Sequence, residues 1–474
     1  MIELLKLCGY EQAEIQTELP RVKKAFGKLG LTDKDIELGK QRLRKYFDME
    51  LEGIRKVFRL CLREFVDSML VREEGKTRVL YGFMAPRYEI IGAAVMAKSE
   101  EIYSINHCWA FMEVVGCIFN RMNPVLEAAE RMWLKGGQVS HCGNVKALLG
   151  AFALGLFPKP DLLITSGGLC ETAPKTLDLL HECYDIPVYF YETCQDRDFH
   201  AYGIDSIRAF KLEARSLRKM TQRMQEVVGF EITDSMLQES LEARKKLDVA
   251  LGKMRSLLLN SNPLALSPTH ESLWACLGSL TLYKNSLEDA VGAVNILCGE
   301  LQERINQGRG VVEKDSPRVL AICPGHQSDP SFEYLVNDLG IAMVAIDSIF
   351  SYPYEGETQD PYIKLALPLQ SIRFLVPSIK IPLLIEGSKR LKVDGVIGRY
   401  HAGCRTVAGD ALIIKEAVEK ELDIPVLVME WENFDPRVFD YQQYRNKLEV
   451  FRAVMLNRMD IPDVKQARPY NNFR

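Results

Sequence analysis

The sequence predicts an α/β protein with two parallel-sheet domains of the flavodoxin-like or Rossmann-like type, a helical N-terminal extension and a helical middle segment. Short apolar runs of strand length alternate with segments of helical periodicity in residues 77–191, and the same alternation returns in residues 318–429. Between these two regions the pattern is almost wholly helical. The 474 residues are also too many for one ordinary domain.

We therefore divide the chain into four parts. They are an N-terminal helical extension (1–75), an α/β domain I (76–206), a helical connecting segment (207–312) and an α/β domain II (313–474). The extension carries Leu, Phe and Arg at helical spacing, which is typical of a capping or dimerisation element.

Each α/β domain is built from predicted strands and helices in alternation. In domain I we expect strands over 77–84, 160–166 and 186–191, and helices over 90–97, 122–134, 144–156 and 172–183. In domain II we expect strands over 318–323, 340–347, 395–400 and 424–429, and helices over 369–390 and 411–419. Pro377 and Pro382 are expected to interrupt the helix over 369–390. The connecting segment is predicted to break over 260–269, which holds two prolines.

Composition excludes several classes of protein. A net charge of −4 and the absence of a basic stripe argue against nucleic-acid binding. No run of 18 apolar residues predicts a membrane span, and the first twenty residues lack the basic start and apolar core of a signal peptide. We expect a cytoplasmic protein. Twelve cysteines in a reducing compartment are then expected to be free thiols, metal ligands or redox groups.

Three cysteines stand where chemistry is expected in a parallel sheet. Cys170 and Cys404 follow predicted strands, and Cys142 precedes the predicted helix over 144–156. Working groups gather at the carboxyl ends of parallel strands, and a helix N-terminus lowers thiol pKa and favours the metal-binding thiolate. No C-x-x-C pair is present, so a zinc ribbon or a bacterial ferredoxin motif is ruled out. Spacing alone leaves two interpretations open: three unrelated buried thiols, or ligands of one iron–sulfur cluster.

Other motifs are weaker. Glu89 follows the first predicted strand, where it either complements a helix dipole or meets a ligand. Cys8 and Cys61 are expected to be packing thiols. The sequence contains no phosphate-binding G-x-x-x-x-G-K-[ST] loop, no G-x-G-x-x-G after a strand and no G-x-S-x-G elbow.

Longer motifs carry a resemblance to a known family. They are HCGNVKALLGAFALG, PKPDLLITSGGLCETAPKTLDLLHECYDIPV, DAVGAVNILCGELQERINQGRG and VDGVIGRYHAGCRTVAGDALIIKEAVEKELDIPVLVMEWENFDPRVFDYQQYRNKLE. With these motifs in this order, residues 77–460 resemble the 2-hydroxyacyl-CoA dehydratase and benzoyl-CoA reductase family, in particular its larger (alpha or B-type) subunit.

The resemblance implies a site and a cofactor. The family's cluster ligands map onto Cys142, Cys170 and Cys404, which implies a [4Fe–4S] cluster with one iron open to water or to the thioester carbonyl. The family's Pro-x-Glu element resembles Pro86-Arg87-Tyr88-Glu89 with one residue of difference in spacing, so Glu89 is the implied catalytic residue.

The resemblance also implies a reaction and its partners. Dehydrating a 2-hydroxyacyl thioester requires loss of an unactivated β-proton, which acid–base catalysis alone does poorly. One low-potential electron gives a ketyl radical anion that expels the hydroxyl group. That electron is implied to come from a separate ATP-hydrolysing iron–sulfur activator, in agreement with the missing phosphate loop. A homologous subunit, in a heterodimer or homodimer, is the other implied partner.

Three alternatives remain open from the sequence. The first is a benzoyl-CoA reductase-type subunit. The second is a double-cubane [8Fe–9S] protein that reduces small molecules, for which Cys108, Cys117, Cys194 and Cys323 supply further candidate ligands. The third, a non-catalytic electron-transfer or scaffold role, is weaker.

Overall fold

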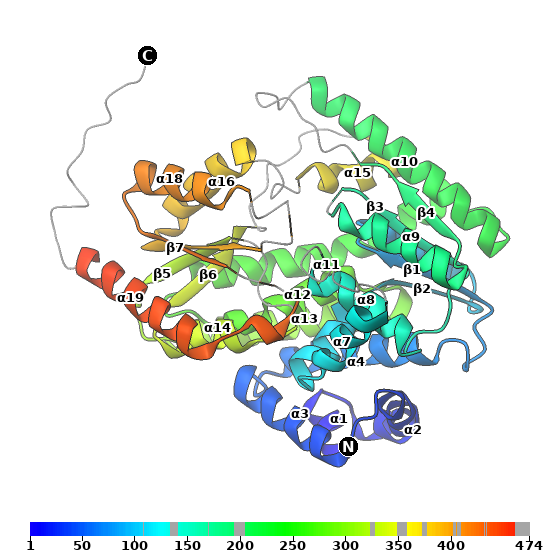
Figure 1. The fold of residues 1–474 in the computed structure, drawn as a ribbon, viewed down its shortest axis with the longest axis horizontal. Helices are drawn as coiled ribbons and strands as arrows, with labels where there is room; N and C mark the ends of the chain where they lie inside the picture. The colour runs from blue at the N-terminus through cyan, green and yellow to red at the C-terminus, as the bar shows by residue number, and fades with distance from the viewer. Residues whose placement is uncertain are drawn as a thin grey trace.

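The computed structural model contains two four-stranded parallel sheets (Figure 1). We call them sheet A, with strand order β2-β1-β3-β4, and sheet B, with order β6-β5-β7-β8. The predicted fold class is confirmed. The structure describes residues 1–107, 109–132, 141–168, 170–193, 204–322, 328–347, 358–371, 377–401, 404, 409–430, 432 and 434–459.

Sheet A is buried on both faces, as a parallel sheet requires. Alternate residues of β1, such as Tyr81 and Leu80, enter different apolar clusters, since side chains alternate along a strand. One face packs on α8 and α9, and the other on α5 and α10. The elements are β1 (Arg78–Phe83), α5 (Tyr88–Lys98), β2 (Ile102–His107), α8 (Gly143–Ala153), β3 (Leu162–Ser166), α9 (Thr172–Tyr184), β4 (Val188–Tyr191) and α10 (Ile204–Val228).

Sheet B repeats this three-layer arrangement. Helices α16 and α18 cover one face, and α14 and α19 cover the other (Figure 1). The elements are β5 (Arg318–Ile322), α14 (Ser331–Asp338), β6 (Ala342–Ile346), α16 (Pro377–Leu391), β7 (Gly395–Tyr400), α18 (Ala411–Leu422), β8 (Val426–Glu430) and α19 (Tyr441–Met459).

One prediction in domain II is wrong. Pro377 begins α16, but Pro382 lies inside that helix and does not interrupt it. A proline in a helix interior costs about 3 kcal/mol. Burial of the two residues that follow it, Leu383 and Leu384, offsets that cost, at roughly 1.5–3 kcal/mol for each fully buried side chain.

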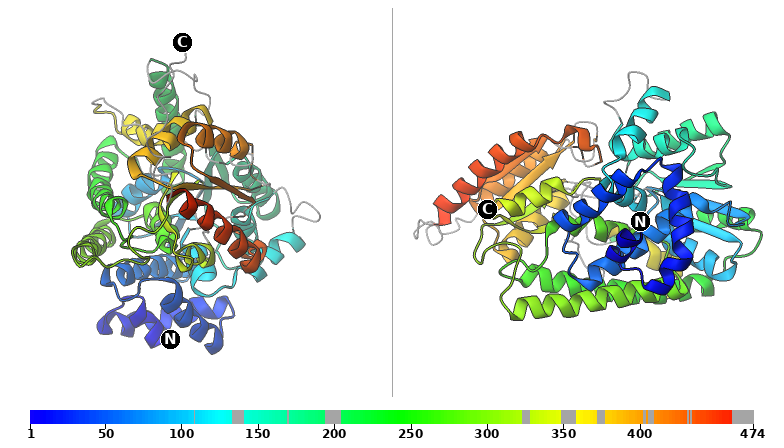
Figure 2. Two further views of the ribbon diagram at one scale, coloured as in Figure 1. Left: turned by 90° about the vertical axis from the view of Figure 1, so that its left-hand side faces the viewer. Right: turned by 90° about the horizontal axis from the view of Figure 1, so that it is seen from below.

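The N-terminal extension is helical, as predicted, and packs beneath the rest of the molecule (Figure 2). Its most apolar helix, α4, is buried along most of its length and contacts α13 of the connecting segment. Arg42 of this extension pairs with Asp329 of domain II at 3.1 Å. The helices are α1 (Ile2–Leu7), α2 (Gln12–Lys28), α3 (Asp33–Tyr46) and α4 (Glu52–Leu70).

The connecting segment joins the two sheets through long helices. Its predicted break near residues 260–269 is present. The helices after α10 are α11 (Asp234–Asn260), η3 (Pro268–His270), α12 (Glu271–Ser279) and α13 (Lys284–Asn306). The remaining elements are α6 (Trp109–Phe111), the π-helix η1 (Met112–Ile118), α7 (Met122–Met132), α15 (Pro361–Ser371) and η5 (Pro436–Val438). None of the helices in the described ranges is both long and apolar enough to cross a bilayer.

Candidate functional site

The carboxyl ends of the two sheets carry the predicted cysteines. Cys170 stands four positions after Ser166, the last residue of β3, and Cys404 stands four positions after Tyr400, the last residue of β7. Cys142 is the N-cap residue of α8, the helix that leads into β3. All three thiols are partly exposed, and the side chains of Cys142 and Cys170 pack against the main apolar core.

The three thiols are electrostatic neighbours. Burial raises the pKa of the Cys142 thiol well above its ordinary value. The charge of Glu432 adds to that shift, followed by the charges of Cys170 and Cys404. The N–H of Val145 acts in the opposite direction, but more weakly. The structure therefore brings the three thiols into one region.

This result corrects the expectation that a helix N-terminus lowers the pKa of Cys142. A thiolate gains from the helix dipole, but it loses more from burial and from neighbouring negative charge. A bound metal would reverse that balance, because cysteine ligands bind as thiolates and metal binding releases their protons.

A single metal ion does not fit the described side chains. They contain no group of three or more His, Cys, Asp or Glu residues close enough to hold one ion. A cubane cluster makes a different demand, since each cysteine binds a different iron of the cluster.

His401 and Glu432 connect the loops that carry Cys404 and Cys142. His401 Nε2 lies 2.7 Å from Glu432 Oε2. The other oxygen, Oε1, accepts the N–H of Gly143, next to Cys142, at 3.3 Å. The N–H of Cys404 donates to the carbonyl of His401 at 2.9 Å. This pair therefore links both cysteine loops across the two domains.

The contact between the domains is close at Gly143. A Cβ built on Gly143 would lie 2.5 Å from the carbonyl carbon of Phe434. That segment continues into the Asp435-Pro436-Arg437 motif, whose arginine bonds Glu130 of α7 at 2.7 Å and Asp435 at 2.6 Å. The motif thus holds domain II against the N-terminal end of α8.

Hydrogen bonds connect the loops at the carboxyl end of sheet A. The hydroxyl of Ser166 donates to the carbonyl of Met84 at 3.1 Å, and the N–H of Gly168 donates to Ser166 Oγ at 3.4 Å. The amide of Asn144 donates to the sulfur of Met84 at 3.3 Å. These bonds join the end of β1, the Cys170 loop and the start of α8.

Glu89 lies apart from these loops. It is buried in the first turn of α5, on the opposite face of sheet A from α8. Its electrostatic neighbours are Arg87 and Tyr191. Burial lowers the pKa of the Arg87 guanidinium, and the charge of Glu89 opposes that shift. No described contact joins Glu89 to a cysteine thiol, so its catalytic role stays a prediction.

Apart from Cys183, which is exposed, the other cysteines fall into three groups. Cys117 is fully buried in η1, where burial and the charge of Glu113 raise its pKa. Cys108, Cys194 and Cys323 lie outside the described residues. Four further thiols are buried in the core: Cys8 and Cys61, as predicted for packing thiols, and also Cys276 and Cys298.

Sequence reasoning missed His401 and Glu432. The available signal was their position, because each follows an apolar strand at the carboxyl edge of sheet B. Their pairing depends on how the two loops fold, which strand patterns do not predict.

The comparisons with known proteins identify the family of this chain. The family profile described as 2-hydroxyglutaryl-CoA dehydratase, D-component, matches residues 91–455. The chain belongs to this family. The B subunit of benzoyl-CoA reductase from Thauera aromatica is 22% identical over 332 residues, which cover 65% of this chain and 75% of that protein. The (R)-phenyllactyl-CoA dehydratase alpha subunit of Clostridium sporogenes is 24% identical over 383 residues, covering 76% of this chain and 86% of that protein.

Solved structures add nothing to this assignment. The Zn(II)-bound AdcAII of Streptococcus pneumoniae, a mutant variant, aligns with 80% of this chain and 100% of its own length at 9% identity. Its TM-score of 0.17 is too low to support an argument about fold.

Proposed function

We propose that this chain is the cluster-bearing subunit of a 2-hydroxyacyl-CoA dehydratase, with one [4Fe–4S] cluster held by Cys142, Cys170 and Cys404. The proposal is supported by the electrostatic coupling of Cys142 to Cys170 and Cys404, and by their positions at the start of α8 and after β3 and β7, in a chain of this family. Of the two relatives, the dehydratase subunit covers more of the chain.

The residues present fit such a cluster. Three thiols from separate loops are suitable iron ligands, and Cys142 carries a raised pKa that bound iron would offset. When bound, the cluster supplies a Lewis-acidic iron and a low-potential electron to the substrate thioester.

The protein's own residues hold and shield this region. Three apolar side chains pack against the same core as Cys142 and Cys170, namely Met84, Trp109 and Phe434, and are proposed to limit access of water. Trp109 and Phe434 contact each other edge to face, with ring centroids 6.2 Å apart. The Glu432–His401 pair holds the loop of Cys404 close to the start of α8, where Cys142 lies. Glu89 remains the proposed acid–base residue, now with Arg87 as its charged neighbour.

The proposal includes three partners. An acyl-CoA ester is the substrate, and an ATP-hydrolysing iron–sulfur activator supplies the electron, because this chain has no phosphate-binding loop. The names of both relatives describe subunits, so a homologous second subunit is proposed as well.

A benzoyl-CoA reductase-type activity is the second candidate, favoured by the similarity to the B subunit of that enzyme. The double-cubane alternative has less support. Cys117, one of its proposed extra ligands, is fully buried in the core within η1.

Iron and sulfide counts after anaerobic reconstitution test the cluster proposal first. We expect one cubane's iron per chain, and its loss in each of Cys142→Ala, Cys170→Ala and Cys404→Ala. The exposed Cys183 provides the matched control, Cys183→Ala, which should keep full iron. Full iron in all three site variants would show that these cysteines are not the ligands. Twice the expected iron in the wild type would favour the double-cubane alternative.

Turnover distinguishes the two reactions. The assay combines the protein, its partner subunit and activator, ATP, a strong reductant, and either a 2-hydroxyacyl-CoA or an aromatic acyl-CoA. A dehydratase uses ATP only to start the reaction and gives many turnovers per ATP. A reductase consumes ATP in step with product, and that result would replace the dehydratase proposal.

A further inference from the structure

The outer surface of α10 carries a stripe of basic side chains. Arg208, Lys211, Arg215 and Lys219 are all exposed, and their spacing of three, four and four residues places them on one face of the helix. The opposite face is apolar and packs on sheet A. We call these four residues the α10 stripe. The sequence predicted no basic stripe, because Glu213 lies among the same residues. In the structure Glu213 is buried, with 2% of its surface exposed, and the basic side chains are exposed.

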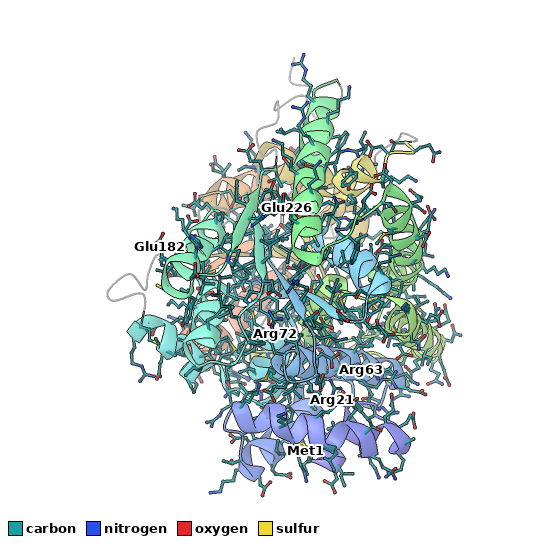
Figure 3. The ribbon with its side chains drawn as sticks, turned by 90° about the vertical axis from the view of Figure 1, so that its right-hand side faces the viewer. Met1, Arg21, Arg63, Arg72, Glu182 and Glu226 are labelled. Atoms are coloured by element: carbon teal, nitrogen blue, oxygen red, sulfur yellow. The ribbon has the colours of Figure 1, made fainter. Side chains whose placement is uncertain are left out.

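The positive charge of the stripe is largely unneutralised. Lys211, Arg215 and Lys219 form no ion pair with a described carboxylate. The next two arginines of α10 differ, since Arg218 pairs with Asp360 at 2.6 Å and Arg223 pairs with Glu226. Lys211, Arg215 and Lys219 therefore place unpaired positive charge along the middle of α10, on the N-terminal side of Glu226, which is labelled in Figure 3.

The stripe begins beside the candidate site. Helix α10 packs on β4, and Tyr191, the last residue of β4, has Glu213 among its charged neighbours. Arg208 and Lys211, which precede Glu213, therefore lie toward the carboxyl end of β4, and Arg215 and Lys219 continue the stripe along the helix. That end leads to Thr193, whose hydroxyl lies 2.3 Å from a Cβ built on Gly168, in the Cys170 loop.

We propose that the α10 stripe binds the phosphate groups of the acyl-CoA substrate, an inference that rests on the proposed function. With the thioester at the thiols, the long pantetheine arm carries the nucleotide end of coenzyme A away from the site and toward its rim. Successive stripe residues are about 4.5–6 Å apart along the helix, a distance suited to neighbouring phosphate groups. Arginine binds phosphate in a bidentate manner, and lysine binds it as a point charge.

A small polyanion fits this surface better than a protein partner. The stripe is one helix wide, and Leu212, 40% exposed, is its one large exposed apolar neighbour on the described part of α10. Protein interfaces usually bury a wider apolar centre.

Calorimetric titration of the full protein with coenzyme A and with 3′-dephospho-coenzyme A tests the inference. The test variant reverses three charges of the stripe, Lys211→Glu/Arg215→Glu/Lys219→Glu. We expect its Kd for coenzyme A to rise by about 30-fold, from roughly threefold for each exposed ion pair. The wild-type Kd should also rise with salt, and dephospho-coenzyme A should bind more weakly than coenzyme A.

A second triple charge reversal controls for net charge. Lys245, Lys246 and Lys253 are exposed on α11, and changing all three to Glu should leave the Kd within about twofold. An unchanged Kd for coenzyme A in the stripe variant overturns the inference while the proposed function stands. The same conclusion holds if the variant loses binding to an acidic protein but keeps its Kd for coenzyme A. If the wild type binds neither coenzyme A nor a 2-hydroxyacyl-CoA, the proposed function fails, and this inference fails with it.

Discussion

Replacing Gly143 with alanine should disturb the place where the two domains meet at the cysteines. The new Cβ would lie 2.5 Å from the carbonyl carbon of Phe434, 2.6 Å from its oxygen and 2.8 Å from the nitrogen of Asp435. All three contacts are with backbone, so no side chain can rotate away to relieve them. Either the segment of Phe434 or the start of α8 must move.

The size of the effect follows from two opposing contributions. Overpacking of this kind costs about 1–3 kcal/mol. Alanine returns about 0.5–1 kcal/mol relative to glycine in a helix. A net loss of roughly 1–2 kcal/mol should lower Tm by about 2–8 °C, at about 2–4 °C per kcal/mol for a folding unit of 150–250 residues.

The decisive readout is iron bound after anaerobic reconstitution, because Cys142 directly precedes Gly143. We expect Gly143→Ala to bind less iron than the wild type at a temperature where both remain folded. The control is Gly252→Ala in α11, where a new Cβ meets nothing within 4 Å, so Tm should rise slightly and iron should not change. Wild-type Tm and iron in Gly143→Ala would refute the close contact between α8 and residues 434–435.

Three further predictions concern buried charge and pH. Lys380 Nζ lies 3.5 Å from Asp347 Oδ2 and 3.3 Å from Asp410 Oδ2. Lys380→Met should therefore lower the free energy of unfolding, measured by urea denaturation, by about 3–5 kcal/mol. Adding Asp410→Asn should recover part of that loss. Burial raises the pKa of Glu113 from 4.5 to about 7. Between these two pH values the folded state binds more protons than the unfolded state. The contribution of Glu113 to the free energy of unfolding therefore falls as pH rises from about 4.5 to 7 and is constant above pH 7. Glu113→Gln should remove that part of the pH dependence and raise the free energy of unfolding at pH 8 by up to roughly 3 kcal/mol, which a parallel dependence in variant and wild type would contradict. Glu432→Ala removes the acceptor of the Gly143 N–H and the partner of His401, so the iron bound after reconstitution should fall. Glu432→Gln retains an acceptor oxygen and should bind more iron than Glu432→Ala.

The sequence was sufficient to predict most strands because they are nearly continuous apolar runs. Strands β3 and β7 are buried along almost all their length, which is what a parallel sheet covered on both faces requires. Strand β2 (Ile102–His107) was not predicted. It is the edge strand of sheet A and includes Ser104 and Asn106, so its apolar residues do not form a run.

Other features depend on tertiary contacts that no local pattern contains. The pKa of Cys142 is raised because Glu432, Cys170 and Cys404 come from distant parts of the chain. The helix rule used for the prediction considers only the dipole of α8. In the same way, Pro382 remains inside α16 because residues next to it are buried against sheet B, a contribution that propensity alone omits.

The two sheets are topologically equivalent, and this equivalence bears on how a cubane would be held. Both have the order 2-1-3-4, so β7 corresponds to β3, and Cys404 and Cys170 occupy the same position after their strands. The helices that precede these strands, α16 and α8, also correspond. Domain I places Cys142 at the start of its helix, whereas no cysteine occurs in residues 348–394, which include all of α16. Two equivalent domains would supply four thiols. Under the proposed function this chain supplies three, and the missing fourth thiol leaves one iron for the substrate.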